Sequence, residues 1–236
     1  MTSRSGTLAL RRAVVAVCRR LYERGLIAGP DGNVSVRLGP DRVLVTPSGM
    51  SKVDVRPADL VEVALDGTRR TSRGARSYRE ASSEVYLHLR MYSRRPDVMA
   101  VVHAHPPVAT GFAVVGETLP PRVLPELIVQ MGDVALVPFA QPGGRAIADA
   151  LEPYVRNHDA FLLANHGAVA VGPSLETAHQ RMESMEHAAR IVLAARLVGR
   201  VNELTAEQVA ALVAARAVNA DVQSRSTART SRRGKA

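Results

Sequence analysis

Residues 98–102 form an unbroken apolar run that continues into His103-Ala104-His105 and is then closed by two prolines. A short apolar run bounded by turn-forming residues is typical of a strand buried inside a sheet. Because side chains alternate between the two faces of a strand, His103 and His105 lie on the same face. A single histidine there could be structural, but a buried apolar strand has little other use for two imidazoles. The pair is therefore a candidate for binding one ion.

A third histidine, His166, is the next candidate. It lies between two further apolar runs, 161–164 and 168–171, which also predict buried strands, and Gly167 would let the backbone approach closely. Three neutral imidazoles leave one position of a tetrahedral ion open, which is the arrangement of catalytic zinc sites.

Another set of metal-ligand residue types lies on the helix predicted over 174–199. His179, Glu183 and His187 are spaced by four and share one helix face. The same stretch carries four more charged residues, Glu176, Arg181, Glu186 and Arg190. We therefore favour a solvated, ion-paired face here over a metal site. His88 and His158 are expected to be structural or surface residues.

The remaining periodicity predicts a mixed sheet flanked by helices. Strands are expected over 33–37, 42–46, 60–65, 98–105, 134–139, 161–164 and 168–171. Helices are expected over 6–24, 82–93, 143–157 and 174–199, and from Thr205, which forms a capping-box pattern with Gln208. Residues 68–80 are expected to form a loop. Without repeats or an internal linker, residues 1–220 are expected to form one α/β domain.

Charge and composition exclude several classes of protein. The formal net charge of the 236 residues is +9, but residues 221–236 alone hold five basic residues and one acid, and we expect them to form a disordered basic tail. Aromatic residues are only 3% of the chain, with no tryptophan, which disfavours nucleic acid as a partner because bases need stacking platforms.

Export and membrane insertion are also disfavoured. No apolar run approaches the ~20 residues that cross a bilayer, and the run 13–17 is too short for a signal peptide. The single cysteine cannot form an internal disulfide. We therefore expect a cytoplasmic protein.

Lysine is rare in this chain. Lys52 and Lys235 are its two lysines among 31 basic residues, and Lys235 falls in the predicted tail. Catalysis through a lysine imine would depend on Lys52 alone and is disfavoured.

Three polar turns could hold a phosphate. They contain Gly32-Asn33, Ser48-Gly49 and Ser82-Ser83, and the serines of the last turn would cap the helix predicted from 82. Free amides and the dipole at a helix N-terminus favour an anion, although each turn taken alone could be only a turn or a cap. Glu84 would then lie beside whatever carries the phosphate.

These segments, in this order, resemble the class II aldolase/adducin family over about residues 8–220. The matching segments are residues 32–37, 46–49, 82–84, 102–105 and 165–167. The resemblance implies an α/β/α sandwich, usually a homotetramer with active sites between subunits. It also implies one divalent ion per subunit, commonly Zn²⁺, with Mn²⁺, Co²⁺ or Fe²⁺ as alternatives.

The same resemblance assigns roles to individual residues. His103, His105 and His166 would hold the ion, and Glu84 would alternate between metal ligand and general acid/base. The residues that match the substrate-phosphate site lie in the three polar turns: Gly32, Asn33, Ser48, Gly49, Ser82 and Ser83. The implied reaction is metal-dependent retro-aldol cleavage of a phosphorylated ketose, giving dihydroxyacetone phosphate and an aldehyde.

One departure from the family leaves alternatives open. Fuculose-phosphate aldolases use two tyrosines as proton donors, at positions that fall here within 124–126 and near Asn219. Glu126 is the only ionisable residue at the first position, and it is either a replacement proton donor or a structural residue. Epimerisation, dehydration or decarboxylation of a sugar phosphate on the same metal site are the alternative reactions. A non-catalytic, adducin-like role is disfavoured because all three histidines and Glu84 are present.

Overall fold

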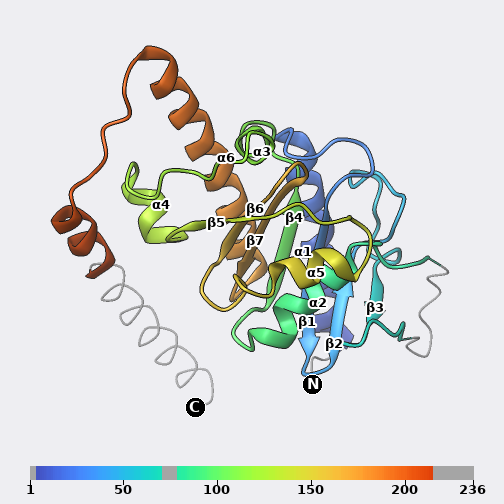
Figure 1. Ribbon diagram of the computed structural model, residues 1–236. Coiled ribbons are helices and arrows are strands. Elements are labelled where there is room, and N and C mark those ends of the chain that lie inside the picture. The colour runs from blue at the N-terminus through green and yellow to red at the C-terminus, as the bar shows by residue number, and fades with distance from the viewer. Residues whose placement is uncertain (1–3, 71–78, 215–236) are drawn as a thin grey trace.

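The computed structural model describes residues 4–70 and 79–214, which form a seven-stranded mixed sheet between two helical layers (Figure 1). The predicted tail and most of the predicted loop 68–80 lie outside the described residues. The strand order is β3-β2-β1-β4-β7-β6-β5, and only β5 and β6 pair in parallel. The strands are β1 (Asn33–Gly39), β2 (Arg42–Val45), β3 (Val61–Val63), β4 (Ala100–Ala104), β5 (Val134–Val137), β6 (Ala160–Leu163) and β7 (Gly167–Gly172).

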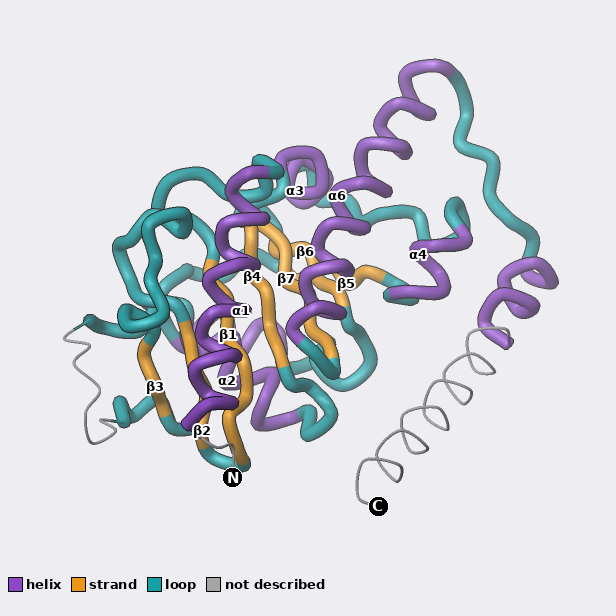
Figure 2. The backbone as a smooth tube through the Cα atoms, turned by 180° about the vertical axis from the view of Figure 1, so that it is seen from behind, coloured by secondary structure: helices purple, strands orange, loops and turns teal. Residues whose placement is uncertain are grey.

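Helices cover both faces of this sheet, which confirms the predicted α/β/α sandwich. Helices α2 (Val85–Arg94) and α5 (Arg145–Leu151) lie in front of the sheet in Figure 1. The view from behind in Figure 2 shows α1 (Arg4–Glu23) and α6 (Leu175–Val198) on the opposite face. Two further short helices, α3 (Pro107–Val114) and α4 (Pro125–Gln130), both pack against α6.

Strand β4 lies in the middle of the sheet and faces both layers. Val102 packs in the core below α1 and α6, whereas Val101 packs in the core below α2 and α5. By the two-residue period, His103 and His105 lie on the face of Val101, toward α2. The sheet therefore aims both imidazoles at the N-terminal end of that helix.

The structure corrects several predicted boundaries. Strands predicted over 60–65, 98–105 and 134–139 are shorter, and the helix predicted over 143–157 spans Arg145–Leu151 and ends in turns. The sequence does not predict helix α3, because the two prolines after His105 by themselves indicate only the end of a strand. Proline is well tolerated in the first turn of a helix, where its missing N–H has no partner to lose.

The predicted capping box near the C-terminal end is confirmed. The Thr205 backbone N–H donates to Gln208 Oε1 at 2.8 Å, and the Gln208 N–H donates to Thr205 Oγ1 at 3.3 Å. A helix follows over 206–214. Over the described residues, no helix combines the length and apolarity needed to span a bilayer.

Candidate metal centre and active-site pocket

Three imidazoles converge at one end of the central strands. His103 is on β4 and His105 follows it, while His166 lies in the turn between β6 and β7, which antiparallel pairing of β4 with β7 brings alongside. The three ring centroids are 4.9–5.1 Å apart, with interplanar angles of 60–67°. Among the described residues these three form the one group whose ligand atoms could share a metal ion. We call them the histidine centre.

The ring nitrogens that face one another in this centre are the Nε2 atoms. His103 Nδ1 lies 2.9 Å from the carbonyl oxygen of Ala168 and donates to it, so Nε2 of a neutral His103 carries a lone pair. His105 Nε2 lies 3.2 Å from His103 Nε2, and His105 Nδ1 lies 3.6 Å from Asp31 Oδ2. Without an ion, a neutral His105 can donate its Nε2–H to His103 Nε2. Two Nε2 lone pairs at the same separation would suit two ligands of one metal ion, so the arrangement fits a shared ion.

The carboxylate of Glu84 completes this donor set. Its Oε2 lies 3.2 Å from His103 Nε2 and its Oε1 lies 3.1 Å from His166 Nε2. Burial by itself would raise the pKa of Glu84, but His103 and His166 lower it well below its usual range, so the group is ionised. The buried atoms Glu84 Oε1 and His166 Nδ1 lack hydrogen-bond partners among the described residues. Imidazole and carboxylate donors together suit zinc and neighbouring transition metals.

Two glycines allow the chain segments around the centre to approach this closely. A Cβ atom on Gly167 would lie 2.5 Å from His105 Cδ2 and 2.7 Å from the Ala104 carbonyl oxygen. Gly32 has a φ of +68°, and a Cβ there would lie 2.7 Å from the His103 carbonyl oxygen. Any larger residue at either position would displace a histidine.

A pocket of about 410 Å³ opens beside the histidine centre. Its lining includes every residue predicted to bind phosphate, namely Gly32, Asn33, Ser48, Gly49, Ser82 and Ser83, together with Glu84, His105 and His166. Backbone hydrogen bonds join two of the polar turns, from Ser48 to Glu80 at 3.0 Å and from Ser82 to Thr46 at 3.1 Å. His103 lies behind the pocket and is fully buried.

The predicted helix cap differs in detail. Helix α2 begins at Val85 with Glu84, rather than a serine, at the N-cap position. Ser82 Oγ instead accepts a hydrogen bond from the Glu84 backbone N–H at 3.3 Å, and Ser83 is exposed in the pocket. The serine turn therefore holds the backbone of Glu84 in place.

A buried chain of hydrogen bonds runs behind Glu84. Asn33 Nδ2 donates to Glu84 Oε2 at 2.9 Å, which leaves Asn33 Oδ1 to accept from His88 Nε2. His88 Nδ1 then accepts from Ser35 Oγ at 2.7 Å, and Ser35 Oγ accepts from Tyr92 at 2.8 Å. Complete burial lowers the pKa of His88 to about 3 and keeps it neutral. His88 is structural, as expected, but it also fixes a residue that contacts Glu84.

Sequence reasoning missed two charged residues of the pocket. Asp31 faces His105, as described above. Lys52 is 2% exposed, and its Nζ donates to the carbonyl oxygens of Pro30 at 2.6 Å and Met50 at 2.9 Å. Burial lowers the pKa of Lys52, and nearby acidic groups that include Asp31 oppose the shift. The rarity of lysine in the sequence was the available signal.

Glu126 does not join the histidine centre within one chain. It lies in α4 and lines a second cavity, of about 510 Å³, between α4 and α6. None of the described tyrosines lines the pocket beside the histidine centre either; these are Tyr22, Tyr86, Tyr92 and Tyr154. Glu84 and Asp31 are thus the carboxylates that line the pocket in the described part of the chain.

We define the helix group as His179, Glu183 and His187 on α6. The structure agrees only in part with the solvated, ion-paired face expected for these residues. The face is ion-paired, because Arg24 Nε lies 2.6 Å from Glu183 Oε1. The expectation of a solvated face is wrong for His179, which is 1% exposed, since α6 packs there against the body of the protein. His187 is exposed in the second cavity. Buried Glu186, beside the group, accepts from the Ala109 backbone N–H at 2.9 Å.

Comparison with known proteins agrees with this architecture. Residues 12–193 match the family model described as the class II aldolase and adducin N-terminal domain. The 3-oxo-tetronate 4-phosphate decarboxylase of Escherichia coli strain K12 is 32% identical over 210 residues, covering 86% of this chain and 95% of that protein. The L-fuculose phosphate aldolase of Methanocaldococcus jannaschii is 30% identical over 183 residues, covering 78% and 95%. A solved L-fuculose 1-phosphate aldolase superposes with a TM-score of 0.80 at 28% identity, covering 90% of this chain and 96% of that one. The chain therefore belongs to the class II aldolase and adducin family.

Proposed function

We propose that this protein is a metal-dependent lyase that breaks the carbon–carbon bond beside a carbonyl group in a phosphorylated sugar or sugar acid. The observation that carries the proposal is the convergence of three imidazoles and Glu84 at a pocket lined by three polar turns. Of the reactions open to such a site, decarboxylation of a 3-oxo acid 4-phosphate is the best supported. Its products would be dihydroxyacetone phosphate and carbon dioxide.

The residues present would divide the substrate between two ends of the pocket. His103, His105 and His166 would hold one divalent ion, with zinc the first choice for this donor set. When bound, the ion would polarise the substrate carbonyl and stabilise the negative charge that develops on its oxygen. Ser48, Gly49 and the serine turn offer hydroxyls and backbone amides for the phosphate.

Decarboxylation requires that one proton be delivered to the substrate. The electron pair of the bond between C1 and C2 moves toward the C3 carbonyl, carbon dioxide leaves, and a proton from solvent is added at C2. Glu84 is the carboxylate closest to the histidine centre and is the group that would pass on this proton. The hydrogen bond from Asn33 holds its Oε2 in a defined direction.

Retro-aldol cleavage is the second candidate, supported by the aldolases among the relatives. It requires in addition that a base remove the proton of the hydroxyl group on the departing carbon. Among the described residues that line the pocket there is no tyrosine to assist, and Glu126 lies in another cavity. The shortage of proton-transfer groups, together with the similarity to the decarboxylase, favours decarboxylation.

The test compares the two reactions on zinc-loaded protein. One sample receives 3-oxo-tetronate 4-phosphate and is assayed for carbon dioxide; others receive a panel of ketose 1-phosphates and are assayed for aldehyde. We expect carbon dioxide and dihydroxyacetone phosphate from the first, with kcat/KM at least about 10²-fold above any aldehyde release. Faster aldehyde release from a ketose 1-phosphate would establish aldol cleavage instead, and no turnover in either assay would refute the lyase proposal.

A further inference from the structure

Lys52 is held at the wall of the active-site pocket by two backbone carbonyls. Its ammonium group has three N–H bonds, and the carbonyl oxygens of Pro30 and Met50 accept two of them. No third hydrogen bond to Lys52 occurs among residues 4–70 and 79–214. A buried ammonium fixed in this way keeps one donor for a ligand in the pocket that it lines.

The contacts of Lys52 place it between the polar turns. Met50 directly follows Ser48-Gly49, and Pro30 lies two residues before Gly32. Both bonds therefore tie the ammonium group to the segments that carry hydroxyls and amides for a phosphate. The histidine centre, by contrast, is reached from strand β4 and the turn before β7.

The pocket otherwise has little positive charge with which to balance a phosphate. Apart from the two imidazoles at the centre, Lys52 is the one basic residue that lines it among residues 4–70 and 79–214, and Asp31 and Glu84 contribute negative charge. The net charge of a phosphate monoester at neutral pH is about −1.5 to −2. Neutral donors beside two carboxylates would compensate that charge poorly, whereas a lysine binds phosphate effectively as a point charge.

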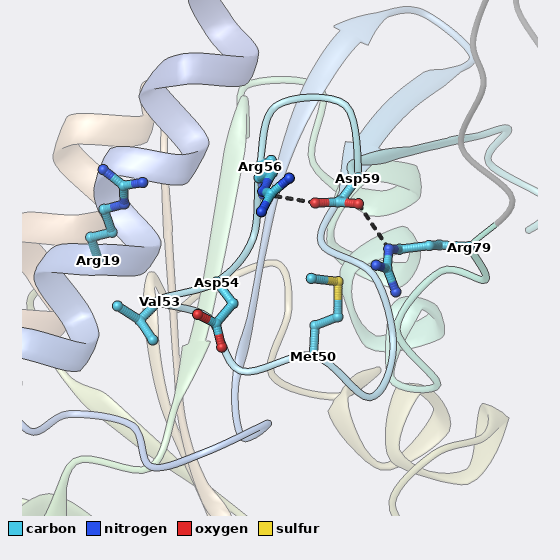
Figure 3. Close-up of a pocket in the computed structure, with 7 residues that line it drawn as sticks. All are labelled: Arg19, Met50, Val53, Asp54, Arg56, Asp59 and Arg79. Atoms are coloured by element: carbon cyan, nitrogen blue, oxygen red, sulfur yellow. Dashed lines mark hydrogen bonds and ion pairs between the residues drawn. The ribbon is translucent and has the colours of Figure 1, made fainter.

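Arg56, the arginine nearest to Lys52 in the sequence, lines a different cavity together with Arg19 and Arg79. This cavity has a volume of about 510 Å³, and Met50 also lines it. Figure 3 shows the side chains of Arg19, Arg56, Arg79 and Met50 around it. Asp59 lies among them and accepts a hydrogen bond from Arg79 at 2.8 Å. These three guanidinium groups do not line the active-site pocket. Lys52, rather than any of them, is therefore the cation that could balance the charge of a phosphate in that pocket.

We propose that Lys52 binds the phosphate of the substrate directly and so makes the pocket specific for phosphorylated ligands. This inference rests on the proposed function, because it assumes a phosphorylated substrate. A purely structural lysine, one that only joins the segments at Pro30 and Met50, would not distinguish phosphorylated from unphosphorylated ligands. That difference gives the test.

The test measures binding of dihydroxyacetone phosphate and of dihydroxyacetone to zinc-loaded protein by calorimetry. Dihydroxyacetone phosphate is a product of both candidate reactions, so the result does not depend on which one occurs. Lys52→Gln removes the charge but keeps N–H donors for the two carbonyls, and Lys52→Met removes both. We expect each to weaken binding of dihydroxyacetone phosphate at least about tenfold, as for loss of a charged hydrogen bond, and to change dihydroxyacetone binding less than about twofold.

Matched controls separate the possible failures. Lys52→Arg, which keeps the charge, is expected to bind dihydroxyacetone phosphate within about fivefold of the natural protein, and Lys235→Met, at the other lysine, within about twofold. Equal losses for both ligands in Lys52→Gln, or no loss for the phosphorylated one, would overturn the role of Lys52 while leaving the proposed function intact. Failure of the natural protein to bind dihydroxyacetone phosphate would refute both. Should Lys52→Met not fold, the Lys52→Gln and Lys52→Arg pair carries the comparison.

Discussion

The histidine centre and the helix group both contain histidines whose spacing in the sequence places them on one face of a strand or helix. They differ in which other side chains lie close to those histidines. In the centre, strand spacing brings two imidazoles together and the turn after β6 supplies the third, with rings 4.9–5.1 Å apart. On α6, His179 is buried with Glu183 Oε2 at 3.5 Å from its Nδ1, whereas His187 is exposed. Periodicity thus places residues on a face, but a metal site needs ligands that converge from separate elements.

The largest difference is expected when one histidine is removed from each region. We expect His103→Ala to reduce zinc content from one equivalent to near zero and to lower kcat/KM at least about 10³-fold, because the centre then has two imidazoles. His187→Ala, the matched change on α6, should keep the metal and activity within about twofold. Elemental analysis and steady-state kinetics measure both. A His103→Ala protein that retains zinc at this site would contradict the difference in metal binding that we propose between the histidine centre and the helix group.

Replacement of Glu84 sharpens the comparison by separating metal binding from proton transfer. Glu84→Gln keeps the shape of the side chain and should retain most of the zinc on the three imidazoles. We expect kcat to fall about 10²–10⁴-fold with a smaller change in KM, since a general acid/base contributes that much. Glu183→Gln on α6 is the control and should leave kcat unchanged. A kcat within tenfold of the natural protein in Glu84→Gln would assign the proton transfer to another group.

The histidine centre also differs from the helix group in the buried hydrogen-bond chain behind it. His88→Ala would leave Asn33 Oδ1 and Ser35 Oγ without their partner, so the unfolding free energy should fall by about 3 kcal/mol and kcat by about 10- to 100-fold. Tyr92→Phe removes only the far end of the chain and should cost about 1 kcal/mol with kcat within twofold. Urea unfolding and kinetics of zinc-loaded protein give both quantities. Equal kcat losses in the two variants would argue against a positioning role for His88.

The smallest effect is expected at His179. Burial lowers its pKa below the ordinary value of about 6.5, although nearby Glu183 opposes the shift. As the pH falls through about 6.5, His179 therefore takes up a proton in the unfolded chain but not in the folded protein. The free energy of unfolding consequently decreases as the pH drops below about 6.5. We expect metal-free natural protein to lose more unfolding free energy between pH 7 and pH 5 than metal-free His179→Leu. Identical pH dependence would show that His179 does not resist protonation.

The central strand and the three histidines of the centre were predictable because their signals are local. The apolar run before His103 and the prolines after His105 identify a buried strand, and Gly167 beside His166 indicates a close approach that the structure bears out. The predicted polar turns line one pocket with Glu84. The roles of these residues as metal and phosphate ligands, and the homotetramer implied by the resemblance, stay predictions.

What could not be predicted depends on contacts between distant segments. Ser35, His88 and Tyr92 lie on β1 and α2, and no local pattern indicates that their side chains form one chain of hydrogen bonds. Lys52 becomes a pocket residue only because the loop after β2 folds back against Pro30. Burial of His179 likewise follows from the packing of α6, whose charged residues by themselves indicate an exposed face.

The claim on which the account depends most is that one cation is shared by the Nε2 atoms of His103, His105 and His166. Anomalous diffraction at the zinc edge from crystals of zinc-loaded protein tests it most directly. We expect a single strong peak per chain, about 2.0–2.1 Å from each of the three nitrogens, with Glu84 beside it. A peak elsewhere, or none although zinc is bound in solution, would contradict the account.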